Sequence, residues 1–439
     1  MIDRKFIREQ TAVVRKAVAD RRLKVDVDAL VRLEEERLDV LRKVEDFRAM
    51  KRRASDKIAQ APADEKQWLI AEMKDFDRDA DKLEKRLSDL DTEIDALLIQ
   101  LPNIPLADVP VGPDESGNVE ARRVGEPTTF NFPVKDHIAL GNALGVIDQE
   151  HAVRVAGARF AYLLGDLVRV QNALGQFVFD LLTDRVALGA LIKKTGLDIP
   201  DTPFVPVVPP LMITPEVFAR MGRLEPRDER YHITGDDLYL IGSAEHTLGP
   251  LHMDEILAEA DLPLRYVALT PAFRREAGSY GKDTRGILRL HQFDKMEMES
   301  FALPEQGLLE QELFVAVQEH VVSALGIPYR VMQICTGDMG TPDARQIDIE
   351  CWMPGQNTYR ETHTSDYMTD FQARRLDTRV KRADSSMQFV HMNDATAVAM
   401  GRMLIAIMEN YQEQNGSIRV PDVLKPYLRG MERIAPRAS

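Results

Sequence analysis

Hydrophobic positions repeat with a heptad period in the first quarter of the chain. Apolar side chains alternate steps of four and three residues along one stretch: Leu69, Met73, Phe76, Ala80, Leu83, Leu87, Leu90, Ile94 and Leu97. A rougher stripe precedes them: Leu30, Leu33, Val40, Val44, Phe47 and Met50. Pro62 lies between the two stripes, where it would interrupt a continuous helix. The pattern predicts an antiparallel hairpin of two helices, each roughly 35 residues and about 50 Å long.

Basic residues gather on the first predicted helix, near the reversal. They are Arg42, Lys43, Arg48, Lys51, Arg52 and Arg53. Such a cluster suits contacts with a phosphate backbone, and the attraction would depend on salt. A solvated face balanced by the acids of the second helix accounts equally well for the same residues.

The stretch that follows the hairpin has no helical stripe. Residues 105–127 are rich in proline, glycine and acidic residues, which is typical of a linker. We therefore expect three parts: a helical arm over residues 1–104, a linker over 105–127 and a second domain over 128–439.

Strand-like and helical patterns are mixed along the second domain. Helical patterns cover residues 135–144, 158–195, 308–325 and 397–412. Apolar or alternating strand-like stretches cover residues 202–212, 238–245, 329–335, 346–353 and 357–364. Strands of this kind with helices set between them predict an α+β domain. Neither a P-loop nor a Rossmann glycine motif is present in the sequence.

A hairpin over residues 270–301 carries the most distinctive chemistry. In its second strand Met296 and Met298 fall on one face, and the other face holds Phe293, Lys295, Glu297 and Glu299. Arg274 and Glu276 share a face of the first strand, and Gly278, Gly281 and Gly286 lie in the connecting loop. Guanidinium, aromatic and carboxylate groups on one surface suit a site that holds a nucleotide and an amine. A solvated hairpin edge would show the same alternation.

Composition narrows the class of protein. The chain has 439 residues, 44% of them hydrophobic, and a net charge of -14, so it can bury a large core and would not coat nucleic acid or membrane indiscriminately. Two cysteines, Cys335 and Cys351, are too few for a disulfide framework. The sequence shows neither a signal peptide nor a membrane span. We expect a cytoplasmic protein with no membrane partner.

Several motifs in the second domain together resemble those of the seryl-tRNA synthetases, a class II aminoacyl-tRNA synthetase family. FRRE followed by AGSYGKDTRGILRLHQFDKMEME resembles motif 2, and NDATAVAMGRMLIAIMENYQ resembles motif 3. ETHTSDYMTDFQARR is similar to a later strand of the family, and the strand around Pro209 and Pro210 to motif 1. The resemblance implies a class II synthetase-type antiparallel sheet catalytic domain with an N-terminal antiparallel α-helical coiled-coil arm. It also implies a homodimer that activates L-serine with ATP and Mg²⁺ and transfers it to tRNA(Ser), and commonly to tRNA(Sec), the arm holding the tRNA.

The resemblance also implies roles for individual residues. Arg274 would bridge the α-phosphate of ATP and the serine carboxylate, a task that suits a planar guanidinium group. The serine-binding residues would be Ser243, Ala244, Glu245, Arg274, Glu297, Asp394 and Thr396. The ATP-binding residues would be Arg274, Arg275, Glu276, Phe293, Glu361, Thr362, His363, Thr364 and Arg402. Glu361 and Thr364 would supply oxygen ligands to magnesium.

Some positions depart from the family pattern. Ser243 replaces the usual threonine and Thr364 the usual serine, and both keep a hydroxyl. Asp394 stands where the family usually has asparagine. An added carboxylate beside Glu297 would raise one of the two pKa values or strengthen the hold on an ammonium group. Two other readings therefore remain open: a serine-activating paralogue with another acceptor or a resistance role, and a non-catalytic RNA-binding or dimerisation homologue.

Overall fold

The computed structural model describes residues 1–60, 62–277 and 285–435. The chain divides into two compact units, Met1–Ile104 and Pro105–Ser439. Gly278 and Gly281, expected in the loop of the site hairpin, lie outside the described residues. Among the residues described, no helix combines the length and the apolar character needed to cross a membrane.

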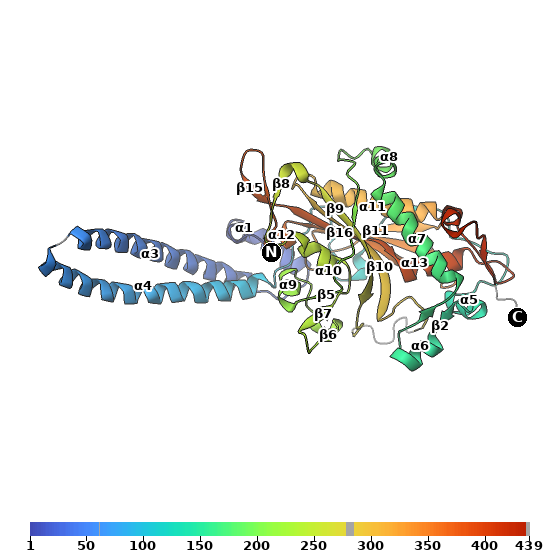
Figure 1. Cartoon of the computed structure of the whole chain (residues 1–439), viewed down its shortest axis with the longest axis horizontal. Helices are drawn as coiled ribbons and strands as arrows, with labels where there is room; N and C mark the ends of the chain where they lie inside the picture. Colours follow the sequence, from blue (N-terminus) through green and yellow to red (C-terminus); the bar gives the residue numbers. More distant parts are fainter. Residues whose placement is uncertain (61, 278–284, 436–439) are drawn as a thin grey trace. The chain divides into compact units, whose positions relative to one another are not determined.

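The first unit confirms the predicted helical hairpin. Two short helices, α1 (Arg4–Glu9) and α2 (Thr11–Asp20), precede the long helices α3 (Val27–Gln60) and α4 (Ala63–Leu98), which run side by side (Figure 1). Apolar side chains form the seam between the long helices: Leu33, Val40, Val44, Leu83, Leu87 and Leu90. The heptad positions Leu69, Met73 and Phe76 lie where side chains are outside the described part.

The long helices are also joined by ion pairs along the seam. Arg48 lies 2.8 Å from Glu84, and Arg86 lies 2.8 Å from Glu36. These pairs are exposed, so each contributes at most about 1 kcal/mol, and the buried leucines and valines supply most of the stability. Arg48 and the other basic residues near the reversal all have exposed side chains on α3.

The second unit is built on an eight-stranded sheet whose neighbours are antiparallel except for β4 and β9. In order across the sheet the strands are β1 (Val119–Val124), β11 (Tyr329–Gln333), β12 (Arg345–Met353), β13 (Thr358–Thr369), β16 (His391–Ala399), β10 (Gln292–Ala302), β9 (Leu264–Phe273) and β4 (Val205–Pro206). The antiparallel α+β class expected from the sequence is confirmed.

Three helices cover one face of this sheet (Figure 1). They are α7 (Asp166–Thr183), α11 (Gly307–Ala324) and α13 (Met400–Asn410). Met296 and Met298 of β10 and Ala395 and Ala397 of β16 are fully buried in the same apolar cluster as these helices. Because side chains alternate along a strand, the residues between them, such as Glu297, lie on the opposite face.

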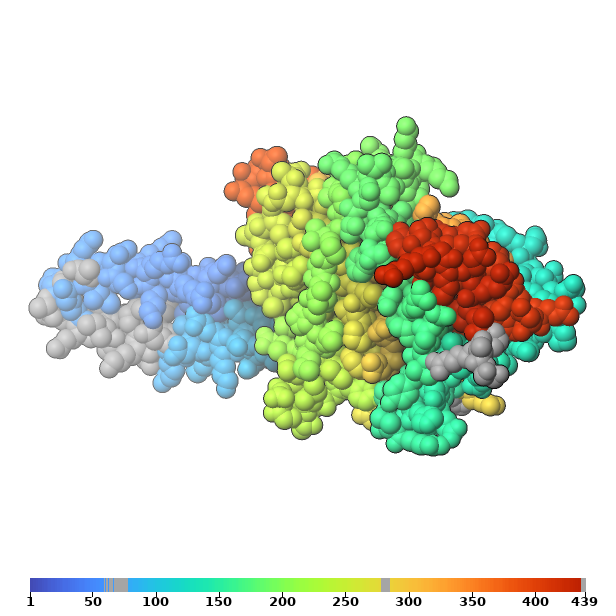
Figure 2. Space-filling view, turned by 45° about the vertical axis from the view of Figure 1, so that its right-hand side comes forward, coloured from blue at the N-terminus to red at the C-terminus, as the bar shows by residue number. Residues whose placement is uncertain are grey.

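The C-terminal segment completes the apolar core on α7. The 3₁₀ helix η5 (Asp422–Leu428) lies against α7 (Figure 2), where the Tyr427 hydroxyl donates a hydrogen bond of 2.8 Å to Asp180. The remaining α-helices and β-strands of the described residues are α5 (His137–Leu144), β2 (Ile147–Asp148), α6 (Gln149–Ala156), β3 (Tyr162–Leu163), α8 (Arg185–Thr195), β5 (Met212–Ile213), α9 (Pro215–Arg220), β6 (His232–Ile233), β7 (Leu238–Leu240), α10 (Glu245–Leu248), β8 (Ile256–Ala258), α12 (Phe371–Leu376), β14 (Arg379–Lys381), β15 (Met387–Phe389), β17 (Ile418–Arg419) and β18 (Arg433–Ile434).

Three stretches differ from the expectation. Residues 105–127 are not a free linker, because β1 within them pairs with β11 at the edge of the sheet. The helix expected over 158–195 is two helices, since Asp184 accepts hydrogen bonds from the first amides of α8 and starts it anew. The helix expected over 397–412 begins only at Met400, because residues 397–399 finish the central strand β16.

Candidate active site

A polar cavity of about 600 Å³ opens on the face of the sheet opposite the helices. Residues distant in the sequence line it, many of them expected at the site: Arg223, Arg230, Ser243, Glu245, Arg274, Glu276, Arg289, Lys295, Glu361, Thr364, Asp366, Asp394 and Arg402. A smaller adjoining cavity adds Phe293, Thr362 and Thr396. The sheet therefore brings together most of the residues that the sequence singled out.

Arg274 follows directly after the last residue of β9. Its Nε donates a hydrogen bond of 3.1 Å to the Gly242 carbonyl, and its guanidinium carbon lies 5.5 Å from the centre of the Phe293 ring. The ring comes from the neighbouring strand β10. These two contacts orient the guanidinium plane before any ligand arrives, as recognition of a planar anionic group requires.

Glu297 is the centre of a small hydrogen-bonded group. The Ser243 hydroxyl donates to it over 2.9 Å and the Thr396 hydroxyl over 3.4 Å, while the Lys295 ammonium pairs with the same carboxylate oxygen. Only 1% of the Glu297 surface is exposed. A buried carboxylate with a cation and two hydroxyl groups suits an ammonium group with a polar side chain.

Two ion pairs also line the cavity. Arg402 of α13 lies 3.1 Å from a Glu361 carboxylate oxygen and donates over 2.8 Å to the Glu361 carbonyl. Glu276 lies 2.7 Å from Arg289, and its backbone takes the left-handed conformation with φ 54°. These arginines can exchange their carboxylate partners for phosphate oxygens, which guanidinium groups bind in the same geometry.

A second polar group, which we call the acidic floor, comprises Arg223, Glu245, Asp366 and Asp394. The Arg223 Nε donates a hydrogen bond of 2.7 Å to Glu245, and the guanidinium lies 3.7 Å from Asp394 and 3.9 Å from Asp366. Burial opposes ionisation of Glu245, but Arg223 outweighs it and lowers the Glu245 pKa to about 2. Burial and the Glu245 charge raise the pKa of Asp394 well above its usual value.

Some expected residues do not line either cavity. The amide of Arg275 donates to the Glu229 carbonyl over 3.1 Å, and its guanidinium carbon lies 6.0 Å from the Tyr231 ring. Ala244 is packed among apolar side chains. His363 is fully buried on the helix-covered side of β13, where burial lowers its pKa to about 3 and keeps it neutral.

The sequence did not single out several residues of the site. Arg223 and Arg230 come from irregular backbone after α9, where no periodic pattern marks them. Burial, followed by the neighbouring Arg274 and Arg223 charges, lowers the pKa of Arg230 to about 10. Asp366 follows Thr364 by two residues on β13, so strand alternation would have placed both on one face.

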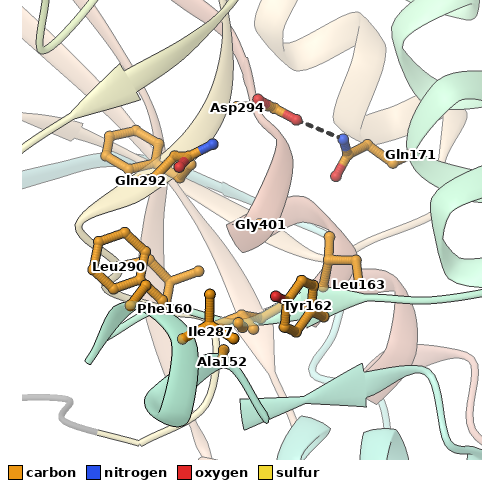
Figure 3. Close-up of a pocket in the computed structure, with 14 residues that line it drawn as sticks. Ala152, Phe160, Tyr162, Leu163, Gln171, Ile287, Leu290, Gln292, Asp294 and Gly401 are labelled. Carbon is orange, nitrogen blue, oxygen red and sulfur yellow. Dashed lines mark hydrogen bonds between the residues drawn. The ribbon is translucent and has the colours of Figure 1, made fainter. Parts of the chain in front are cut away.

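Another cavity, of about 400 Å³, shares Phe293 as a wall with the smaller site cavity. Its apolar side chains, including Phe160, Ile287 and Leu290, gather on one side (Figure 3). On the other side Gln171 donates a hydrogen bond of 2.8 Å to Asp294. Phe293 thus lies in the partition between an apolar and a polar space, the position expected for a ring that stacks on a ligand base.

Glu299 makes the free energy of unfolding depend on pH. It is fully buried, neither carboxyl oxygen has a hydrogen-bond partner among the described residues, and burial and Asp394 raise its pKa well above 4.5. Above about pH 4.5 the unfolded chain loses this proton while the folded chain keeps it, so stability falls as pH rises. We expect Glu299→Gln to raise the thermal unfolding midpoint at pH 8 more than at pH 5, as measured by calorimetry.

The matched control is Glu126→Gln, which changes an exposed glutamate. It should not appreciably shift the unfolding midpoint at pH 5 or at pH 8. An equal shift of Glu299→Gln at both pH values would contradict the assignment of a protonated Glu299.

Comparisons with known proteins agree with this geometry. Residues 1–105 match the seryl-tRNA synthetase N-terminal domain, and residues 229–411 match the class II tRNA synthetase core domain of the G, H, P, S and T enzymes. The serine–tRNA ligase of Brucella canis is 43% identical over the full length of both chains.

Solved structures give the same result. The seryl-tRNA synthetase from Pyrococcus horikoshii, in complex with ATP, has a TM-score of 0.89 and 35% identity over the whole of both chains. The cytoplasmic serine–tRNA ligase from Naegleria fowleri, in complex with AMP, has a TM-score of 0.86 and 30% identity, covering 100% of this chain and 99% of its own. Since sequence and structure agree over its full length, the chain belongs to the seryl-tRNA synthetase family of class II aminoacyl-tRNA synthetases.

Proposed function

We propose that this chain is an ATP-dependent serine–tRNA ligase that forms seryl-adenylate and transfers the seryl group to tRNA(Ser), and to tRNA(Sec) where that tRNA is present. One observation carries the proposal. Arg274 enters the same cavity as the Ser243–Glu297–Thr396 group and the Glu361–Arg402 pair, on a class II sheet. Family membership supports the same activity.

Adenylate formation joins two anions, so positioning and charge neutralisation are the main tasks. A serine carboxylate oxygen bonds to the α-phosphorus of ATP while the bond to pyrophosphate breaks. Arg274, held by Gly242 and Phe293, would place its two terminal nitrogens between the carboxylate and the α-phosphate. Arg402 would stabilise the γ-phosphate of the departing pyrophosphate.

Transfer uses the same cavity. The terminal ribose hydroxyl of the tRNA attacks the carbonyl carbon of seryl-adenylate, and AMP leaves. Neither step forms a covalent bond to the enzyme. The adenine would stack on Phe293 and donate a hydrogen bond from its amino group to the Glu276 carboxylate. Glu276 has a left-handed backbone and follows directly after the arginines of motif 2.

Serine recognition would centre on Glu297. The carboxylate would bind the α-ammonium, and the Ser243 and Thr396 hydroxyls would bind the polar atoms around it. A site built to bond a substrate hydroxyl rejects an analogue that lacks it, because buried polar groups are then unpaired. Alanine is therefore expected to be a poor substrate.

The residues present fit a magnesium ion bound with the nucleotide. Glu361 and Thr364 both line the large cavity and offer oxygen atoms. Mg²⁺ prefers one or two protein oxygens together with phosphate oxygens and water. Such an ion would neutralise phosphate charge, and Arg402, already paired with Glu361, would stand beside it.

The other parts of the proposal concern partners. The exposed cations Arg42, Lys43, Lys51, Arg52 and Arg53 on α3 would contact the tRNA backbone. Val205 and Val208 are 54% and 99% exposed beside the Pro209–Pro210 segment, which supports a homodimer interface there. Protein synthesis would place the enzyme in the cytoplasm.

The two alternative readings have less support. A paralogue that loads a carrier protein has no use for a tRNA-binding arm, whereas α3 and α4 are complete here. A non-catalytic homologue would have no reason to keep Arg274 and Arg402 at one cavity with Ser243, whose hydroxyl donates to Glu297.

The test is amino-acid-dependent exchange of pyrophosphate into ATP with serine, threonine, alanine and glycine. We expect exchange with serine to exceed exchange with alanine by at least about 100-fold, because a missing hydroxyl leaves buried partners unpaired. Absence of exchange with serine would rule out the proposed activity.

A further inference from the structure

The acidic floor places several carboxyl groups around one guanidinium. Arg223 faces the Glu245, Asp366 and Asp394 carboxylates, and the Asp343 carboxylate lies 3.6 Å away as well. Glu245 accepts a hydrogen bond of 2.7 Å from the guanidinium. The distances of 3.7 and 3.9 Å to Asp394 and Asp366 exceed the usual hydrogen-bond range.

Asp394 has a buried carboxyl oxygen, Oδ1, without a hydrogen-bond partner among the described residues. It is 5% exposed and lines the cavity. Its cross-strand neighbours are Glu299 on one side and Asp366 on the other, so three acidic residues stand side by side on β10, β16 and β13. Like charges in such positions destabilise a sheet unless a cation or a proton joins them.

The contrast with Glu297 is instructive. Glu297 already has the Lys295 ammonium and two hydroxyl donors at Oε1, while its Oε2 has no hydrogen-bond partner among the described residues. The acidic floor has one guanidinium for several carboxylates. Serine brings one ammonium group and one hydroxyl group, which leaves no cationic group for Asp394 Oδ1.

We infer that the acidic floor binds a cationic side-chain group, an inference that rests on the proposed function. The site then activates small amino acids with a β-ammonium group, the 2,3-diaminopropionate class, as well as serine. Asp394 and Thr396 lie two residues apart on one face of β16, about 7 Å along the strand. A three-carbon amino acid with nitrogen at both positions can therefore meet Glu297 and Asp394 together.

The reaction step is the same as for serine. The carboxylate oxygen of the amino acid bonds to the α-phosphorus and pyrophosphate leaves, while the β-ammonium keeps its protons and takes no part. An ammonium beside Asp394 also favours ionisation of that carboxylate, whose pKa burial and Glu245 raise in the free site. The cation would provide Asp394 Oδ1 with the donor it lacks.

The experiment measures pyrophosphate exchange by the full chain with serine, L-2,3-diaminopropionate and alanine. We expect diaminopropionate to exceed alanine clearly in kcat/KM. In Asp394→Asn the ratio of diaminopropionate to serine should fall at least about 10-fold, the loss expected for one hydrogen bond to a charged group. Asp366→Asn is a second variant with the same expected direction. The exposed Asp237→Asn should leave the ratio unchanged.

The outcomes separate this inference from the proposed function. If the protein catalyses exchange with serine, but diaminopropionate gives no more exchange than alanine, the inference is overturned and the proposed function stands. Absence of exchange with any amino acid would overturn the proposed function. An unchanged ratio in both Asp394→Asn and Asp366→Asn would show that the acidic floor does not bind the side-chain cation.

Discussion

Removal of the outer part of the helical arm, residues 46–82, is expected to abolish aminoacylation of tRNA and to spare serine-dependent pyrophosphate exchange. Every residue that lines the active-site cavity belongs to the unit Pro105–Ser439, whereas the arm belongs to Met1–Ile104. The deletion removes Arg48, Lys51, Arg52 and Arg53 together with the surface that carries them. We expect kcat/KM for tRNA to fall on the order of 10³-fold, since several phosphate contacts are lost at once.

The deletion, closed by a short glycine-containing turn, keeps Val40, Val44, Leu87 and Leu90 of the helical seam, so the remaining arm can still pack. Triple replacement of Lys51, Arg52 and Arg53 by glutamine is a milder variant. It should weaken charging and reduce the dependence of tRNA binding on salt. Charging by the shortened protein at the wild-type rate would contradict a role for the arm.

Replacing Arg274 with alanine is expected to reduce serine-dependent exchange by about 10²–10³-fold, or roughly 3–4 kcal/mol, the loss typical of one preorganised electrostatic donor. The guanidinium is already fixed by Gly242 and Phe293, so its contribution requires little reorganisation during the reaction. The steady-state exchange rate at saturating ATP and serine is the measurement.

Arg274→Lys separates charge from shape. Lysine retains the positive charge but cannot bond the carboxylate and the phosphate with two parallel N–H groups, so most of the loss should persist. The surface variant Arg185→Ala, which removes an exposed arginine paired with Asp201, should retain full exchange. Near-normal exchange by Arg274→Ala would contradict the bridging role of this arginine.

Elements with strong periodicity could be predicted from the sequence. The heptad pattern predicted the helical arm because the seam between two helices needs apolar residues at regular steps. Val40, Val44 and Leu90 are buried as expected. The alternation of β10 placed Met296 and Met298 in the core and Glu297 at the site for the same reason. The pattern at β1 is weaker, and a linker was expected there. Its side chains are exposed, and its strand conformation depends on pairing with β11.

The composition of the site could be predicted only where motifs or strand alternation marked it. Arg223 comes from irregular backbone, and only the folded chain brings it within 2.7 Å of Glu245. Asp366 stood within a quoted motif, but its proximity to Asp394 depends on the register between β13 and β16. His363 shows the opposite case, because it stands within the quoted motif while the strand pleat turns its side chain into the core.

Arg223 also limits the order in which this site can evolve. Loss of the guanidinium alone would leave Glu245 and its acidic neighbours buried without a positively charged partner. Such a loss typically lowers the free energy of unfolding by about 3–5 kcal/mol. Replacement of the acids first would make the same loss tolerable, so the effects of these substitutions are far from additive. A lineage that carries the acidic floor therefore cannot replace Arg223 without a large loss of stability until Asp366 and Asp394 have been replaced.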